Sequence, residues 1–184
     1  SLDLNNSSRE NKNFSSPKKA HPKRTFYLRQ VELPYYLQEN RIIFRPVKGK
    51  IEFRENERWG GPLEQGIGRV LGINLSEFLE SPYYSVYPHR KKVGAFYEIS
   101  ITINRFERVD SSKVLLEGSW QLFTDDFKNG TYPVINTKEI LHTEFNSLST
   151  NTDFINEEVL ALSKTLSILA GKITLAINSY ETNL

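Results

Sequence analysis

A glycine-rich stretch, GGPLEQGIG at residues 60–68, is the part of the sequence whose composition best suits a chemical site. Gly61 and Gly66 have the spacing of the first half of a phosphate-binding loop. Such a loop continues with a lysine, which contacts the outer phosphates, and a Ser or Thr, whose hydroxyl holds magnesium. Ile67 and Gly68 occupy these two positions. A dinucleotide fingerprint also needs a different glycine spacing after a buried strand, so the stretch predicts no nucleotide site.

The same residues fit an amphipathic helix over residues 61–80. Pro62 suits the first helical position, where its missing amide hydrogen costs nothing. Residues that recur at intervals of three and four form one face of this helix. They are Leu63, Ile67, Val70, Leu71, Asn74, Leu75, Phe78 and Leu79. Gly66, Gly68 and Gly72 each weaken a helix by roughly 1 kcal/mol relative to alanine. We therefore expect them to allow a strand or a second helix to approach closely.

No other combination of residues predicts catalysis or metal binding. No two histidines have a spacing that would share a metal, and the three are His21, His89 and His142. Asp125 and Asp126 are neighbours in a turn-forming segment, whereas glycosidase-type catalysis needs two carboxyl groups facing each other across a substrate. Ser119 lacks the Gly-x-Ser-x-Gly context of a nucleophile elbow. Because the chain also has no cysteine, we expect a non-enzymatic protein with no metal or cofactor.

Length and composition predict a single domain after a flexible leader. The 184 residues are 38% hydrophobic, which is enough for one core, and no run of eighteen apolar residues predicts a membrane span. Residues 1–23 are rich in Ser and Asn and poor in large apolar side chains, so they cannot bury enough surface to become ordered. We expect residues 1–23 to form a flexible tether and residues 24–184 to form the domain. The alternative is a solvated tail without a role.

The basic leader leaves nucleic-acid binding as a second alternative function. Of the 24 Lys or Arg and 22 Asp or Glu, residues 1–30 contain seven and two, so the remainder is slightly acidic. A basic segment binds nucleic acid without sequence preference, and it binds anionic lipid surfaces through the same charges. The remainder, however, shows no RNA-binding aromatic signature and no helix-turn-helix spacing.

Several runs rich in β-branched and aromatic residues predict strands. They cover residues 26–33, 41–47, 51–54, 83–87, 95–104, 116–122 and 132–145. The run at 95–104 alternates apolar and polar residues, as a half-buried strand does. Strands, a helix, further strands and a closing helix describe an α+β fold. We expect a single domain with a mainly antiparallel sheet and two principal helices packed on one side.

Residues 154–180 carry the most regular pattern in the chain and predict the closing helix. Its apolar stripe is Ile155, Val159, Leu162, Leu166, Leu169, Ile173, Ala176 and Tyr180. We expect this stripe to pack on the protein's own sheet, although the heptad-like spacing also fits an intermolecular seam. Leu160, Ile168 and Leu175 lie on a neighbouring flank, so the apolar face is wide enough for both the core and a partner subunit.

Short motifs follow one another in a characteristic order over about residues 25–180. They are Tyr27-Leu28, Val31, Leu33-Pro34, Tyr36-Leu37, Ile42-Ile43, Arg58-Trp59, Pro62-Leu63, Arg69, Leu71, Asn74-Leu75, Tyr87-Pro88, Arg105-Phe106 and Trp120, before the closing helix. In this order they resemble the ABC-type transport auxiliary lipoprotein family, which includes lipoproteins similar to paraquat-inducible protein C and YmbA. Gly60-Gly61 departs from the Ala-Glu usual in that family. The lipidated cysteine is also missing, and we expect it to precede Ser1.

The resemblance implies a periplasmic lipoprotein that is lipid-anchored to the outer membrane. Its implied role is that of a non-enzymatic accessory subunit in an ABC/MCE-type intermembrane lipid transport system. The implied partners are a mammalian-cell-entry (MCE) domain protein and inner-membrane transporter components, and the implied assembly is a homo-oligomeric ring. A free-standing periplasmic module that binds lipid or protein is the alternative.

Two groups of residues are candidates for contacts with partners. The first is at the junction between a loop and the glycine-bearing helix and consists of Arg58, Trp59 and Leu63. A tryptophan beside an arginine is typical of interface anchors, but a tryptophan that covers the core is the alternative. The second group is a basic loop formed by His89, Arg90, Lys91 and Lys92. We expect it to contact lipid headgroups or acidic residues of a partner, with a solvated turn as the alternative.

Overall fold

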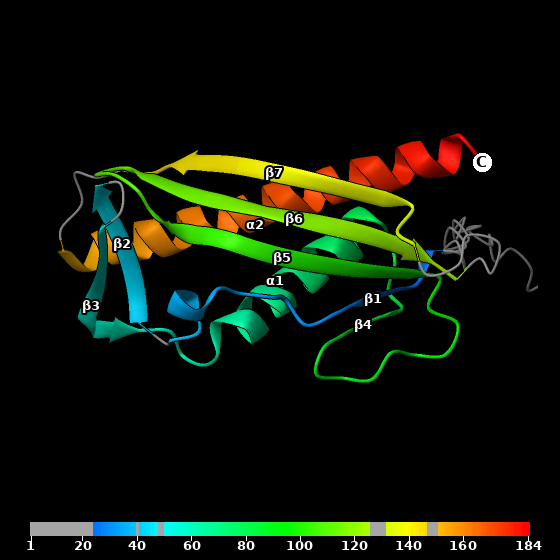
Figure 1. The fold of residues 1–184 in the computed structure, drawn as a ribbon, viewed down its shortest axis with the longest axis horizontal. Coiled ribbons are helices and arrows are strands. Elements are labelled where there is room, and N and C mark those ends of the chain that lie inside the picture. The colour runs from blue at the N-terminus through cyan, green and yellow to red at the C-terminus, as the bar shows by residue number, and fades with distance from the viewer. Residues whose placement is uncertain (1–23, 40, 48–49, 126–131, 147–150) are drawn as a thin grey trace, which may run out of the picture.

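The computed structural model describes residues 24–39, 41–47, 50–125, 132–146 and 151–184, and of residues 47, 55–58 and 151–153 it describes the backbone alone. These residues form one α+β domain in which a seven-stranded sheet is covered on one face by two helices (Figure 1). The predicted α+β class and the single domain are confirmed. The predicted leader at residues 1–23 lies outside the described residues, as does Asp126 of the predicted turn.

The helices and strands follow the order that the sequence predicts. The strands are β1 (Phe26–Leu28), β2 (Arg41–Val47), β3 (Lys50–Arg58), β4 (Tyr84–Val86), β5 (Tyr97–Arg108), β6 (Lys113–Thr124) and β7 (Ile135–Glu144). The helices are α1 (Leu63–Phe78) and α2 (Asn151–Thr182), and a 3-10 turn, η2 (Tyr35–Leu37), connects β1 to β2. β1 is shorter than predicted, and β3 is longer.

The sheet is mixed, so the prediction of a mainly antiparallel sheet is wrong. β1 runs parallel to both β4 and β5, whereas the β2–β3, β5–β6 and β6–β7 pairs are antiparallel. The strand order is β3-β2-β5-β1-β4, with β6 and β7 following on the other edge of β5. β4 is parallel to β1 because α1 carries the chain back to the end of the sheet where β1 begins, as a crossover connection does.

The core lies between the sheet and the helices. β5 directs Tyr97, Ile99, Ile101 and Ile103 into it, and β6 contributes Trp120 among others. On the opposite face of β5, Glu98, Ser100, Thr102 and Asn104 are polar and at least partly exposed, as are Glu117, Ser119 and Gln121 of β6. The period-two pattern in the sequence is therefore the pattern of burial, as expected for a sheet covered on one face.

The closing helix, α2, packs on α1, β6 and β7. Its buried residues are Glu158, Ala161, Leu162, Thr165, Leu166, Leu169, Ala170, Ile173, Thr174 and Ile177. Of the predicted stripe, Leu162, Leu166, Leu169 and Ile173 are buried, whereas Ile155, Val159, Ala176 and Tyr180 are partly exposed. On the neighbouring flank, Leu160 and Leu175 are 63% and 67% exposed. Residues Phe154–Thr182 are also long enough to span a membrane, and the mean hydropathy of their most apolar window is 1.5, a property that the sequence pattern did not predict. Half of the most apolar window is buried inside this fold, as in the core helix of a folded domain.

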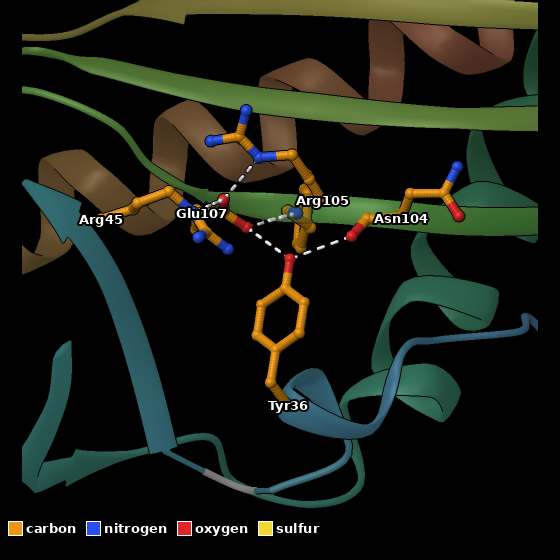
Figure 2. A network of polar contacts seen from close by, with 6 residues as sticks. Tyr36, Arg45, Asn104, Arg105 and Glu107 are labelled. Atoms are coloured by element: carbon orange, nitrogen blue, oxygen red, sulfur yellow. Dashed lines mark hydrogen bonds and ion pairs between the residues drawn. The ribbon is translucent and has the colours of Figure 1, made fainter. Parts of the chain in front are cut away.

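The hairpin formed by β2 and β3 is fixed to the sheet by a buried carboxylate (Figure 2). The Glu107 side chain in β5 is 0% exposed and accepts hydrogen bonds from Nε of Arg45 and Nε of Arg105, each at 2.9 Å. The Tyr36 hydroxyl donates to the second carboxylate oxygen at 2.8 Å. Burial raises the pKa of Tyr36, and the negative charge of Glu107 raises it further. The hydroxyl therefore remains protonated as a donor.

A second buried carboxylate ties the same hairpin to α2. Glu158 accepts a hydrogen bond from Arg54 of β3 at 2.8 Å and forms an ion pair with Arg108 of β5 at 3.2 Å. The Arg108 guanidinium stacks over the Phe44 ring of β2, 3.5 Å from its centroid. Burial lowers the pKa of Arg108, while Glu158 opposes that shift. With Glu107 and Glu158 both paired, the hairpin is held to both layers of the fold.

The glycines of α1 differ in how closely other parts of the protein approach them. An ideal Cβ on Gly72 would lie 2.5 Å from Cγ2 of Val86 in β4, and one on Gly68 would lie 3.4 Å from Cγ1 of the same residue. The predicted close approach is confirmed at these two positions, and the neighbour is strand β4. A Cβ on Gly66 would meet no atom within 4 Å, so for this glycine the prediction is wrong.

The contrast between Gly72 and Gly66 makes a stability prediction. Gly72→Ala forces the new methyl group against Val86, whose branched side chain has little rotamer freedom, and we expect a loss of about 1–3 kcal/mol. Gly66→Ala meets open space and improves helix propensity, so we expect a gain of up to about 1 kcal/mol. Urea unfolding of both variants checks this, and equal effects would contradict the close contact with β4.

The Glu107 network makes a second prediction. Glu107→Gln keeps the size of the side chain but leaves Arg45 and Arg105 without their carboxylate, and we expect a loss of about 3–5 kcal/mol. The matched control is Glu52→Gln in β3, where the ion pair with Lys50 is largely exposed. An exposed pair contributes at most about 1 kcal/mol. Chemical unfolding of the two variants under identical conditions gives the comparison, and similar losses would rule out a special role for Glu107.

Candidate functional site: a basic groove beside the first helix

A groove of about 880 Å³ lies between the start of α1 and the strand β4 with the loop that follows it. Its volume is in the range of sites that bind small molecules or short peptide segments. The residues that line it are Trp59, Gly60, Gly61, Pro62, Leu63, Gln65, Gly66, Arg69, Tyr84, Ser85, Val86, Tyr87, Pro88, His89, Arg90 and Lys92. Part of the glycine-rich stretch, Gly60 to Gly66, therefore forms one wall of this groove.

The first wall is positioned by the anchored hairpin and by the start of the helix. β3 ends at Arg58, Trp59 follows at once, and α1 begins at Leu63 after Pro62. Trp59 is half-buried and packs against the hydrophobic core, while it also lines the groove. Leu63 is buried. The side chain of Arg58 is outside the described part of the chain, and the backbone of this residue pairs with Arg41.

The second wall is the loop between β4 and β5, which several hydrogen bonds hold. The backbone amide of His89 donates to the carbonyl of Val86 at 2.9 Å, and the amide of Lys92 donates to Oγ of Ser85 at 3.4 Å. The hydroxyl of Thr25 donates to the carbonyl of Gly94 at 2.7 Å. These bonds fix the exposed basic residues of the loop opposite the start of α1.

The structure brings the two predicted groups of contact residues to one site. Trp59 and Leu63 lie on one side of the groove, and His89, Arg90 and Lys92 lie on the other. The sequence predicted the two groups separately and gave no sign that they adjoin, because residues 64–88, which include most of α1 and all of β4, separate them. The single-site arrangement is a property of the fold.

Lys91 is the exception in the basic loop, since it does not line the groove. Its ammonium forms an ion pair with Glu98 of β5 at 3.0 Å, and Arg29 pairs with the other oxygen of the same carboxylate. Burial acts to raise the pKa of Glu98, but the bonds from Arg29 and Lys91 outweigh it and lower the pKa. Two adjacent lysines therefore have different roles, because Lys92 faces the groove and Lys91 stabilises the sheet surface.

The groove is positively charged. Its lining includes Arg69, Arg90 and Lys92 together with His89, and it includes no Asp or Glu. Within the described ranges, no carboxylate pairs with Arg69, Arg90 or Lys92. The groove therefore carries positive charge that no residue of its lining neutralises. It is suited to binding a negatively charged group.

Several lining residues were not among the predicted contact residues, and Arg69, Tyr84 and Tyr87 are the largest of them. Arg69 occupies the exposed side of α1, Tyr84 is the first residue of β4, and Tyr87 follows β4 directly. Arg69 and Tyr87 did appear among the motifs of the family resemblance. That order of motifs was the one signal in the sequence that could have placed them at a site.

Comparison with known proteins places this fold in a family. The sequence model of the family described as "ABC-type transport auxiliary lipoprotein component" matches residues 9–174. The chain therefore belongs to the ABC-type transport auxiliary lipoprotein family, a class of transport components whose description names no enzymatic activity. The match begins inside the predicted leader.

Individual relatives agree with that family. The chain is 27% identical over 100 residues to the intermembrane transport lipoprotein PqiC of Escherichia coli, covering 54% of this chain and 51% of that protein. The chain thus spans about half the length of the curated relatives that it matches. Protein XCC0632 from Xanthomonas campestris shares the fold, with a TM-score of 0.65, 16% identity and coverage of 91% and 94% of the two chains. The crystal structure of a second, uncharacterised protein gives a TM-score of 0.66 at 21% identity, with coverage of 84% and 92%.

The position of Trp59 makes a third prediction. Because this side chain packs against the core while it lines the groove, we expect Trp59→Ala to destabilise the domain by about 2 kcal/mol, or roughly 4–8 °C in melting temperature. Tyr35→Ala is the control, since Tyr35 is 82% exposed and its loss should leave the melting temperature unchanged. Thermal unfolding of both variants gives the answer. An unchanged melting temperature for Trp59→Ala would assign the side chain to the groove surface alone.

Proposed function

We propose that this chain is a non-enzymatic periplasmic accessory lipoprotein of an ABC/MCE-type intermembrane lipid transport system, lipid-anchored to the outer membrane. In this role it docks as a subunit onto an MCE-domain protein that works with inner-membrane transporter components. Two findings support the proposal: the family match over residues 9–174, and the similarity to a protein named as an intermembrane transport lipoprotein. The residues that we assign to partner contacts are Arg58, Trp59, Leu63, His89, Arg90, Lys91 and Lys92.

The groove is the structural observation that carries this proposal. It joins aromatic and apolar side chains with cations that no carboxylate pairs among the described residues. A tryptophan beside cations in a concave surface is the kind of site at which interfaces concentrate their binding energy. Its lining combines the residue types of a docking site. Lys91 contributes to this surface indirectly, because its pair with Glu98 fixes the loop.

We further propose that copies of the chain associate through the exposed flank of α2 into a homo-oligomeric ring. Leu160, Ile168 and Leu175 recur along this flank at spacings of eight and seven residues, which keeps them on one side of the helix. Apolar side chains that repeat along an exposed helix face are typical of helix–helix contacts between subunits. The flank shares no residue with the groove.

A free-standing module that binds a lipid or a protein in the groove is the second candidate function. The volume of about 880 Å³ favours it, since a cavity of this size holds a ligand without help from other subunits. The two candidates differ in the state of the protein in solution. A docking subunit of a ring forms a discrete oligomer, whereas a free-standing module is a monomer.

Mass measurement in solution tests the ring. We expect a discrete oligomer for the wild-type chain, and a shift to monomer for the Leu160→Glu/Leu175→Glu double variant, because burying two carboxylates at a subunit contact is strongly unfavourable. Ile73→Glu, at an exposed position of α1, is the matched control and should keep the oligomer. Light scattering at several concentrations reads out the mass. A wild-type chain that stays monomeric at high concentration would contradict the ring and favour the free-standing module.

A further inference from the structure

The charge of the groove comes from two elements that lie on opposite sides of it. Arg69 projects from the exposed side of α1, and Arg90 and Lys92 belong to the loop after β4. No carboxylate of the groove lining neutralises these three cations. They therefore give the concave space a positive electrostatic potential. A ligand that fits this space is negatively charged.

Strand β4 adds a second feature to the same space. β4 is the last strand in the sheet order and pairs with β1 alone among the described strands. Tyr84, Ser85 and Val86, which make up β4, also line the groove. The carbonyl of Val86 already accepts the His89 amide. An extended chain placed in the groove could pair with the other main-chain groups on the edge of β4 that β1 does not use.

We propose that the groove binds an acidic, extended peptide segment of the partner transport protein, which adds to the sheet as a strand beside β4. This inference rests on the proposed function, because it specifies the partner chemistry of the same site. Alternate side chains of a strand point to opposite sides. Acidic side chains on one side of the strand reach Arg69, and acidic side chains on the other side reach Arg90 and Lys92. The apolar side chains of the segment contact Trp59 and Tyr87.

Other occupants fit these features less well. The leader of this chain, residues 1–23, carries more basic than acidic residues. Its net charge has the same sign as that of the groove, so the two repel each other. A bilayer surface is flat or convex on the scale of a domain and contacts protruding residues, such as the fully exposed Val93 at the tip of the loop. A single lipid headgroup satisfies the cations but makes no use of the strand edge.

Peptide binding tests the proposal directly. The probe is a fluorescent eight-residue peptide in which pairs of glutamates alternate with valine–tyrosine pairs, so that both faces of the strand carry acidic groups. Its binding to the full chain is measured by anisotropy. We expect binding that weakens with added salt, as screening requires, and no binding of the same peptide with glutamine in place of glutamate. Methylation of the backbone amides at alternate positions blocks one edge of the peptide strand. One of the two methylated sets should therefore abolish binding, while the other should retain it.

Matched variants locate the binding site. The triple variant Arg69→Gln/Arg90→Gln/Lys92→Gln should weaken the acidic peptide about tenfold, the effect of three exposed ion pairs taken together. The triple variant Lys50→Gln/Lys138→Gln/Lys164→Gln removes the same number of charges from exposed residues outside the groove lining. We expect it to bind as the wild type does. Equal weakening by both variants would show that net charge alone attracts the peptide and would overturn the proposal.

Two further measurements separate this inference from its competitors. Sedimentation with phosphatidylglycerol vesicles tests a lipid occupant: loss of vesicle binding in the groove variant, with no peptide binding by the wild type, overturns the peptide proposal. Co-purification with the MCE-domain protein tests the proposed function itself. If that protein co-purifies equally with wild type and groove variant, docking uses another surface, so the inference fails and the function stands. If it co-purifies with neither while the acidic peptide binds at the groove, the function fails and the inference stands.

Discussion

The contact between α1 and β4 at Gly72 is the constraint on which the rest of the site depends. With no side chain at this position, Val86 approaches the helix backbone to a distance at which a Cβ would clash. The helix therefore packs close to β4, and its first turns lie opposite the loop that follows β4. Six residues earlier, at Gly66, the same helix faces open space. The change from close contact to open space along one helix is what makes a groove rather than a packed interface.

Buried charge positions the other side of that groove. Glu107 and Glu158 are almost completely inaccessible, and each is acceptable inside the protein because arginine side chains from different elements surround it. Between them they tie β2, β3, β5 and α2 together, so the chain leaves β3 at Arg58 in a fixed place and Trp59 follows. Arginine thus has two roles in this domain. Where a carboxylate faces it, the residue holds the fold together, and where none does, as at Arg69 and Arg90, it gives the surface a charge.

Sequence patterns predicted the helices and strands well, because buried positions recur regularly along a helix or a strand. Apolar residues in the sequence recur at the same intervals. The stripe from Leu162 to Ile173 and the alternation from Tyr97 to Ile103 could be predicted in this way. The direction of β4 could not, because pairing with β1 depends on the crossover through α1, and that is a property of the path in space. Lys91 and Lys92 are neighbours of the same type, and no local signal separates the one that pairs with Glu98 from the one that faces the groove. Sites built from distant segments share this difficulty.

The arrangement of the groove and the α2 flank bears on how such a subunit could work in an assembly. On the proposed function, a subunit that both associates with copies of itself and docks onto a partner needs two surfaces that do not compete. The groove is built by α1, β4 and their flanking loops, and the flank belongs to α2 alone. α2 packs on α1 and on the sheet through its opposite, buried side, so its exposed flank does not depend on the walls of the groove. Since the charged site and the apolar flank also differ in chemistry, salt weakens the first and leaves the second largely unchanged.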